Sequence, residues 1–324
     1  MYNKINRFDT FTKLRTVVLG ELNYSLLTLL EDNQKDKWKR IYNGIDKTFT
    51  QIETIFKKFD IEVFRPKPIK VSTDLVTPFY TVPACKSTIS PFDNFLTISN
   101  TIVEMTSSTE SNFFDYPQYQ HIWEECWKNG SRWISMPRPR YEIDYNEPLA
   151  DSPSFCLFGD TIFHSASESV NELGIQWVKN EFPEFNYIQI DSGHGHLDGF
   201  FSILKPGVII SGLAKDKLPS CFNNWDLIYF ARENYDDITQ DNELLQDWDY
   251  QNTTLGANCF SIDDENVLML KNTIDSSPEK IKQIEKHKIN VIPIDFPETR
   301  WVNQGLSCMC NAIYRDGNKE NYIK

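Results

Sequence analysis

Short apolar runs, each bounded by turn-forming residues, recur along the chain and predict strands that pair as hairpins. The runs are rich in β-branched and aromatic residues, which is typical of strands in a packed sheet. The turns between them contain Gly, Pro, Asn, Asp and Ser. Four predicted hairpins join 95–98 to 101–103, 154–157 to 161–163, 200–204 to 208–211, and 258–262 to 267–270.

A second pattern, with apolar residues three or four positions apart, predicts amphipathic helices. The longest stripe covers 38–56, and shorter helices are predicted at 117–128 and from Ser277 onward. A further helix is predicted to begin at Ser165, which has capping-box spacing to Glu168. Its predicted apolar face consists of Val170, Leu173, Trp177 and Val178. Single apolar runs that follow the helices or polar turns predict strands at 61–64, 132–135, 187–190, 227–230 and 291–294.

The order hairpin, helix or turn, strand therefore occurs four times, although the units share no residue identity. A fifth unit forms if the last predicted strand, near 308–314, pairs with the first, at 16–19. Five ββαβ units closed into a ring form a five-fold α/β-propeller with no free sheet edge. The alternative, a doubly wound parallel sheet, is disfavoured by the hairpins and lacks a Gly-rich phosphate loop. We expect one domain over 1–324, with a loosely held polar end at 1–15.

The chain is acidic, with a formal net charge of −13 from 33 basic and 46 acidic residues. It has no Lys/Arg cluster that would neutralise phosphates, so a nucleic-acid partner is not expected. An acidic protein is compatible with a cationic small substrate. The longest apolar run, near 200–213, is interrupted by Lys205 and Pro206 and is too short to span a membrane. With no secretory signal and no zinc-type spacing among seven cysteines, we expect a cytoplasmic protein with reduced thiols.

Polar residues concentrate just before one predicted strand. The stretch 191–207 holds two of the five histidines, His194 and His196, and the carboxylates Asp191 and Asp198. The ends of rigid strands are common places for chemistry. His196 beside Asp198 suits an acid/base with an anionic neighbour. The two histidines lack a third ligand at a matching spacing, so no metal is expected.

A second polar stretch near the end of the chain contains Cys308 and Cys310. If this stretch is extended, the two thiols face opposite ways, so one faces a site while the other packs. We expect Cys308 to be a nucleophile and His196 its acid/base; the alternative is that both cysteines are ordinary buried residues. Asp93 and Asp151 are single acids just before apolar strands. Turn or cap aspartates are the simplest interpretation of them, and membership of the site is the other.

The chain resembles the guanidino-group-modifying enzymes in five residues that follow one another in the same order: Asp93, Asp151, His196, Asp198 and Cys308. Within this group it is most similar to the arginine:glycine amidinotransferase family, over nearly the whole chain. In the firmest stretch, 159–207, GDTIFHSASESVNELGIQW is similar to the family's GRDIF…LGIEW, and HLDGFFSILKPGVIIS to its HIDATF…PG. Earlier, VFRPKPI and SPFDNFLTI resemble the RPDPI and PRD motifs. The resemblance implies the pentein α/β-propeller, in agreement with the repeat.

The resemblance also implies roles for individual residues. Cys308 would be the nucleophile, although the family's His-Cys-x-Thr is Ser-Cys-Met-Cys here. His196 would be the acid/base, and Asp151 its orienting carboxylate, where the family's FDAAD becomes LADSPS. Asp93 and Asp198 would hold a guanidinium.

Two cations are candidates for the donor's α-carboxylate. Lys215 falls where the family has an arginine with that role, and Arg300 is the alternative. The implied reaction moves an amidino group from a guanidino donor, L-arginine, to an acceptor amine through an amidino-cysteine. Small-molecule substrates are the implied partners, no cofactor is implied, and a homodimer is left open. An arginine deiminase or dihydrolase, and a non-catalytic pentein that only binds a ligand, are the alternatives; the acceptor is not identified.

Overall fold

The computed structural model describes residues 3–69, 74–76, 81–82, 88–106, 115–140, 147–167, 169–192, 196–230, 256–302 and 304–323. Within this part, the chain forms five three-stranded sheets and one small hairpin, β3 (Leu75–Val76) with β4 (Thr81–Val82). No helix among these residues is long and apolar enough to cross a membrane.

The five three-stranded sheets share one internal plan. The middle strand of each pairs antiparallel with one neighbour and parallel with the other. In this order of antiparallel, middle and parallel strand, the sheets are β17 (Cys310–Arg315), β1 (Leu14–Leu19), β2 (Glu62–Phe64); β5 (Phe95–Ile98), β6 (Thr101–Glu104), β7 (Arg132–Ser135); β8 (Phe155–Phe158), β9 (Thr161–His164), β10 (Asn186–Gln189); β11 (Phe201–Lys205), β12 (Val208–Ser211), β13 (Asp226–Tyr229); and β14 (Phe260–Ser261), β15 (Asn266–Leu270), β16 (Asn290–Ile294).

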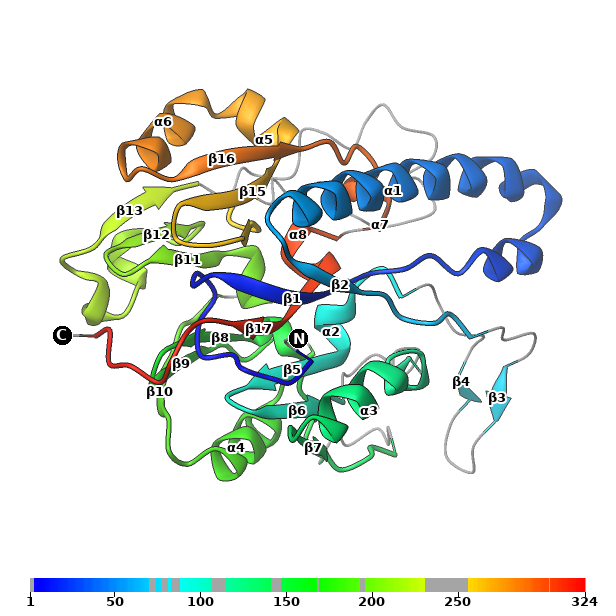
Figure 1. The fold of residues 1–324 in the computed structure, drawn as a ribbon, viewed down its shortest axis with the longest axis horizontal. Coiled ribbons are helices and arrows are strands. Elements are labelled where there is room, and N and C mark those ends of the chain that lie inside the picture. Colours follow the sequence, from blue (N-terminus) through cyan, green and yellow to red (C-terminus); the bar gives the residue numbers. More distant parts are fainter. Residues whose placement is uncertain are drawn as a thin grey trace.

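Pairing between β1 and β17 joins the two ends of the chain. Leu19 lies opposite Cys310 and Val17 lies opposite Ala312 in the antiparallel register. The predicted fifth unit, made from the last and the first strand, is therefore confirmed. Figure 1 shows these two strands, blue and red, side by side near the centre of the molecule.

Side-chain packing, and not strand pairing, closes the ring. Within the described residues, both end strands of each three-stranded sheet pair on one side only, so the expectation of a ring without sheet edges is wrong. Instead, five clusters of buried apolar side chains fill the spaces between neighbouring sheets. Phe158 and Phe163 of the third sheet, for example, pack with Phe201 and Ile203 of the fourth. The result is a mixed α/β propeller of five modules.

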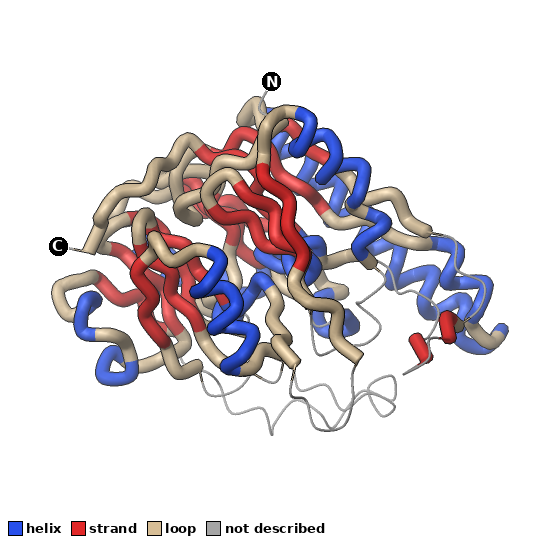
Figure 2. Tube along the Cα trace, turned by 90° about the horizontal axis from the view of Figure 1, so that it is seen from below, coloured by secondary structure: helices blue, strands red, loops and turns tan. Residues whose placement is uncertain are grey.

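Helices cover the outside of this ring. In four modules, helices connect the middle strand to the strand that is parallel to it. In the fourth sheet, two 3-10 turns make this connection, η6 (Lys215–Lys217) and η7 (Ser220–Phe222). Figure 1 shows strands between two groups of helices, and Figure 2 shows the helices at the periphery. The helices are α1 (Asp32–Lys58), α3 (Gln120–Lys128), α4 (Glu172–Glu181), α5 (Lys271–Ser276) and α6 (Pro278–Lys286).

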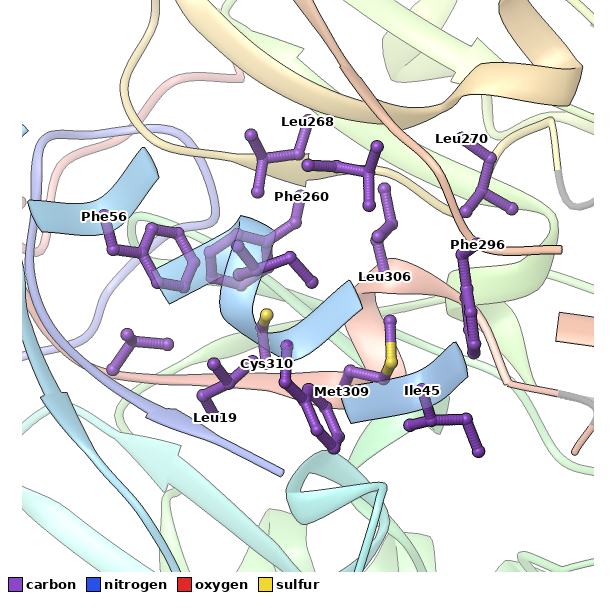
Figure 3. Packing of buried hydrophobic residues seen from close by; sticks show 14 of the residues in the cluster. Leu19, Ile45, Phe56, Phe260, Leu268, Leu270, Phe296, Leu306, Met309 and Cys310 are labelled. Atoms are coloured by element: carbon purple, nitrogen blue, oxygen red, sulfur yellow. The ribbon is translucent and has the colours of Figure 1, made fainter. Parts of the chain in front are cut away.

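Helix α1 follows the predicted apolar stripe closely. Its stripe residues are buried, apart from Trp38, which is half-buried: Ile41, Ile45, Phe49, Ile52 and Phe56. Figure 3 shows Ile45 and Phe56 of α1 among side chains from β1, β15 and the end of the chain. Full burial of such a side chain stabilises the fold by about 1.5–3 kcal/mol, so packing holds this long helix in place.

Helix α4 begins later than the capping pattern predicts. Its N-cap is Asn171, whose side-chain oxygen accepts hydrogen bonds from the backbone N–H groups of Gly174 at 2.8 Å and Leu149 at 3.1 Å. Asn171 thus caps the helix and ties it to the preceding segment, which places the boundary six residues after Ser165. Glu168 lies outside the described residues. Leu173, predicted on the apolar face, is 46% exposed.

The N-terminal segment is not a loose end, contrary to expectation. Ile5, Arg7, Asp9 and Phe11 are all buried. The backbone of Arg7 exchanges two hydrogen bonds with that of Ser99, at 3.0 and 2.7 Å. Alternate residues of the segment therefore point into the propeller, and two of them carry charges, which is why the sequence suggested an exposed arm.

Candidate active site

Four short turns carry the candidate residues, and each turn directly precedes a strand that is antiparallel to the middle strand of its sheet. Asp93 lies in α2 (Pro91–Asn94), Asp151 caps η4 (Ser152–Ser154), His196 and Asp198 belong to the turn around η5 (Leu197–Gly199), and Cys308 lies in α8 (Leu306–Met309). Turn α2 packs against α8 and η4, and η4 packs against η5. Equivalent positions of different modules therefore meet at one end of the propeller.

His196 and Asp151 form an ion pair, with 2.9 Å between Nε2 and Oδ2. The Asp151 side chain is buried, and the His196 side chain is 33% exposed. Ser169 Oγ lies 3.0 Å from His196 Nε2, and Ser154 Oγ donates a hydrogen bond to Asp151 Oδ1 at 3.0 Å. The carboxylate is thus fixed from two sides, and it in turn orients the imidazole.

The ion pair keeps both of its members charged. Burial alone lowers the pKa of His196, but the charge and hydrogen bond of Asp151, with the charges of Asp93 and Asp198, raise it to about 10. Burial raises the pKa of Asp151, but the His196 charge and several hydrogen bonds hold it below its usual value. His196 is therefore an imidazolium at neutral pH.

Asp93 and Asp198 form the other side of the site, and neither has an ion-pair partner within the described residues. Burial raises the pKa of Asp93 to about 7, against the lowering effect of the His196 charge. Burial likewise raises the pKa of Asp198. Within the described residues, Asp93 Oδ1 is buried without a hydrogen-bond partner. Two half-buried carboxylates of this kind favour a cation between or beside them.

Cys308 lies in a helical turn and not in the predicted strand. Its Sγ accepts a hydrogen bond from the backbone N–H of Gly305 at 3.4 Å and lies 3.7 Å from Asp198 Oδ2. Burial, followed by the charges of Asp198 and Asp93, raises the pKa of this thiol well above its usual value. When no cationic ligand is bound, Cys308 is therefore a neutral thiol.

Cys310 is the first residue of β17 and lies in different surroundings. It packs among apolar residues that include Leu19 and Met309, as Figure 3 shows. Burial raises the pKa of its thiol as well. The two cysteines do differ as predicted, but the reason is the helical turn that ends between them and not the alternation of a strand.

Asn258 and Ser307 belong to the site although the sequence did not single out Asn258. The Asn258 amide donates to Asp198 Oδ2 at 3.1 Å and lies 3.7 Å from Cys308 Sγ, and its oxygen accepts from the Ser307 N–H at 2.9 Å. The Ser307 hydroxyl also donates to Asp198 Oδ2. A Cβ at Gly305 would lie 2.1 Å from Asn258 Oδ1, so this contact requires glycine. The sequence placed Asn258 inside the predicted strand 258–262, whereas it lies just before β14, as the other site residues lie just before their strands.

Known proteins with similar sequences are amidinotransferases. No family model matches the chain. Inosamine-phosphate amidinotransferase 1 of Streptomyces glaucescens is 24% identical over 251 residues, which are 72% of this chain and 69% of that protein. Mitochondrial glycine amidinotransferase of Danio rerio is 22% identical over 317 residues, 86% of this chain and 72% of that protein.

Solved structures agree with the sequence relatives. SxtG, an amidinotransferase from Microseira wollei, has a TM-score of 0.82 at 21% identity and covers 98% of this chain and 99% of its own. Inosamine-phosphate amidinotransferase StrB1 from Streptomyces griseus has a TM-score of 0.83 at 19% identity, covering 99% of both chains. The chain is similar to amidinotransferases in sequence, and it shares the fold of SxtG and StrB1. The resemblance and the fold expected from the sequence are both confirmed.

More distant neighbours within the superfamily are hydrolases. DDAH from Pseudomonas aeruginosa, solved with citrulline, has a TM-score of 0.62 at 14% identity and covers 93% of this chain and 99% of its own. The propeller is therefore shared by proteins of different reaction types, and the choice between transfer and hydrolysis depends on the site.

The remaining residues that the sequence singled out are Lys215, Arg300 and His194. Lys215 lies in η6 with an exposed side chain. The backbone of Arg300 belongs to α7 (Thr299–Val302), but its side chain lies outside the described part, as does all of His194. No group of His, Cys, Asp and Glu side chains suited to a metal ion occurs within the described ranges.

Proposed function

We propose that the protein moves an amidino group from a guanidino donor, L-arginine, to an acceptor amine through a covalent amidino-Cys308. One observation carries this proposal: the Cys308 sulfur lies against the half-buried carboxylate of Asp198, and the His196–Asp151 ion pair completes the same cluster. The similarity to amidinotransferases supports the same reaction.

The carboxylates supply the binding step. A guanidinium is planar and positively charged, and carboxylates accept its N–H groups in pairs. A bound cation favours the charged forms of Asp93 and Asp198, whose pKa values burial has raised. The positive charge of the donor therefore offsets the negative charges of Asp93 and Asp198. Its central carbon is then held close to the Cys308 sulfur.

Binding also activates the thiol. The charges of Asp198 and Asp93 oppose ionisation of Cys308 in the free protein. A guanidinium cation offsets these charges, so the Cys308 proton passes to solvent as the donor binds and the thiolate attacks the guanidino carbon. His196 is already protonated in the free protein and need not take this proton.

His196 then acts first as an acid and later as a base. The imidazolium gives its proton to the donor's δ-nitrogen as the C–N bond breaks, and ornithine leaves. The amidino group remains on Cys308. The neutral imidazole next takes a proton from the acceptor amine, which attacks the amidino carbon and releases the thiolate. Asp151 stabilises the imidazolium in both steps.

Product analysis tests the proposal. Arginine is incubated with single amines, including glycine and an inosamine phosphate because the relatives' names point to these acceptors. We expect ornithine formation that depends on an amine, a new guanidino product of matching mass, and one amidino group on the Cys308 peptide after an arginine pulse. Ornithine formation that needs neither Cys308 nor an acceptor would contradict the proposal.

Hydrolysis is the second candidate, because DDAH and an arginine dihydrolase share the fold. In a deiminase, water resolves the intermediate and arginine alone yields citrulline and ammonia. Steady citrulline formation without any amine would replace the transferase proposal with the hydrolase. A pentein that only binds a ligand is disfavoured, because nucleophile, acid and carboxylates are all assembled.

A further inference from the structure

Asn311 is a fully buried amide in the strand that follows the nucleophile turn. It is the second residue of β17 and comes shortly after Cys308 in the chain. Its exposed fraction is 0%, and its neighbours Cys310 and Ala312 are buried as well. A polar side chain is rarely buried in this way unless its donors and acceptors are bonded. The contacts of the Asn311 amide therefore indicate what the residue does.

The nitrogen of this amide contacts the turn that carries Asp93. Asn311 Nδ2 donates a hydrogen bond to the backbone oxygen of Phe95 at 2.7 Å, and it lies 3.5 Å from the backbone oxygen of Pro91. These two carbonyl groups flank Asp93, because α2 begins at Pro91 and β5 begins at Phe95. One amide thus reaches both ends of the Asp93 turn, with the firmer contact at Phe95.

The oxygen of the same amide faces the N-terminal segment. Arg7 Nη1 lies 3.5 Å from Asn311 Oδ1 and donates to Thr97 Oγ1 at 3.1 Å. The guanidinium of Arg7 also lies 5.3 Å from the ring centroid of Phe92, which belongs to α2. A guanidinium can only donate and a carbonyl can only accept, so this orientation of the amide is the one that bonds on both sides.

Asn311 therefore connects the Asp93 turn to the segment of the nucleophile. Turn α8, which holds Cys308, leads directly into β17, and α2 packs against both of them (Figure 1). Within α2, the backbone N–H of Asp93 and the amide of Asn94 both donate to the backbone oxygen of Ser90, at 3.3 and 3.1 Å. A helical turn of four residues has few hydrogen bonds of its own, so its position depends on contacts such as that with Asn311.

We propose that Asn311 is a positioning residue, which holds the Asp93 turn against the Cys308 turn at the spacing that a bound guanidinium requires. A leucine would fill a similar volume, but it would leave the Phe95 carbonyl buried without this donor and would let α2 shift. The inference rests on the proposed function for the role of Asp93 toward the donor. The spacing between Asp93 and Cys308, in contrast, can be tested without any substrate.

Alkylation of Cys308 by iodoacetamide reports this spacing in the substrate-free protein. The charge of Asp93 opposes ionisation of the thiol, so Asp93→Asn should speed alkylation at pH 8 by about fivefold. Asn311→Leu should speed it by about twofold, because the carboxylate moves away from the sulfur. In the double variant, Asn311→Leu should add nothing to Asp93→Asn, since the charge through which it acts is gone. Peptide mass spectrometry assigns the alkylated cysteine.

Asn6→Leu is the matched control for the loss of a buried amide. The Asn6 side chain also donates to two backbone carbonyls, those of Arg315 at 2.6 Å and Gly317 at 3.0 Å, but at the other end of β17. It should leave the alkylation of Cys308 unchanged. If Asn311→Leu does not fold, Asn311→Ala takes its place, because it removes the same groups without adding a branched side chain. Unchanged alkylation in the folded Asn311 variant, or an equal increase with and without the Asp93 charge, would overturn the proposal.

Arginine kinetics separate this inference from the proposed function. Asn311→Leu should raise KM for arginine by roughly tenfold and change kcat by less than about threefold, because Asp93 is displaced whereas His196 and Asp151 are not. An unchanged KM in a variant of a protein that does process arginine would also overturn the proposal. Failure of the wild-type protein to act on arginine would contradict the proposed function, and the alkylation cycle would then decide the role of Asn311 alone.

Discussion

The two sides of the candidate site differ in how their charged side chains are paired. His196 and Asp151 form a closed ion pair, in which each member keeps the other charged. Asp93 and Asp198 are half-buried and form no ion pair within the described residues, and burial raises the pKa of both. The charges of His196 and Asp151 thus offset each other without a ligand, whereas the carboxylates of Asp93 and Asp198 favour a bound cation. In the proposed mechanism, binding of the cationic substrate therefore prepares the Cys308 thiol.

Removing the Cys308 sulfur should have the largest effect. We expect Cys308→Ala to lower turnover by on the order of 10⁵-fold, because no covalent intermediate can form. Cys310→Ala is the matched control and should keep most of the activity, because Cys310 packs in an apolar cluster. Steady-state assays and peptide mass spectrometry after an arginine pulse measure both. An amidino adduct on Cys310 would reverse the assignment.

Removing the Asp151 charge from the His196–Asp151 ion pair should have the next largest effect. In Asp151→Asn the main cause of the raised pKa of His196 is lost. The imidazole would then be mostly neutral above its usual pKa of about 6.5, and we expect kcat to fall by roughly 10³-fold at pH 8. Stopped assays across pH measure the change, with the hairpin-turn variant Asp160→Asn as control.

The pH profile gives this prediction a second readout. The wild-type kcat/KM should fall as pH rises through about 10, where His196 loses its proton. In Asp151→Asn this limb should move down toward neutral pH. A variant that only unfolds the turn would lose activity at every pH without moving the limb, and an unmoved limb in a folded variant would contradict the role of Asp151.

Removing the Asp93 carboxylate from the other side of the site should weaken substrate binding. Asp93 has a pKa raised to about 7, and its protonated form cannot pair with a guanidinium. The wild-type kcat/KM should therefore rise with pH through about 7. Asp93→Asn should lower kcat/KM by roughly 100-fold, mainly through KM, and remove this rising limb. Asp264→Asn, in an exposed turn, is the control; a rising limb that persists in Asp93→Asn would assign it to another group.

The sequence predicted the modules because each repeats a local pattern. Hairpin turns and amphipathic spacing are visible within short windows, and even the pairing of β1 with β17 followed from counting units. The buried charges were not visible in this way. Arg7 and Asp9 belong to a polar segment, and only the closed ring shows that it enters the core.

The site was predicted to a similar extent. Asp151, His196, Asp198 and Cys308 were named, and the structure brings them together. The turn at Cys308 was not predicted, because four residues are too few for a helical periodicity. Asn258 was missed because it was placed inside the predicted strand 258–262, and its contacts with Asp198 and Ser307 join segments far apart in the chain.

Asn258 links the open side of the site to the nucleophile turn, and changing it should have the smallest effect of this series. Asn258→Ala removes one donor to Asp198 and one acceptor for Ser307 N–H, and we expect roughly a 10-fold loss in kcat/KM. Asn258→Asp keeps an acceptor for Ser307 but sets a second negative charge beside Asp198 and Cys308. If Asn258 acts by donating its N–H, the aspartate variant should be the worse one and should slow alkylation of Cys308 by iodoacetamide at a given pH, because the thiol pKa rises. Asn290→Ala, at an exposed position of the same module, is the control. Equal losses in both Asn258 variants, with unchanged alkylation, would mean that Asn258 only supports the fold and does not position the charges around Cys308.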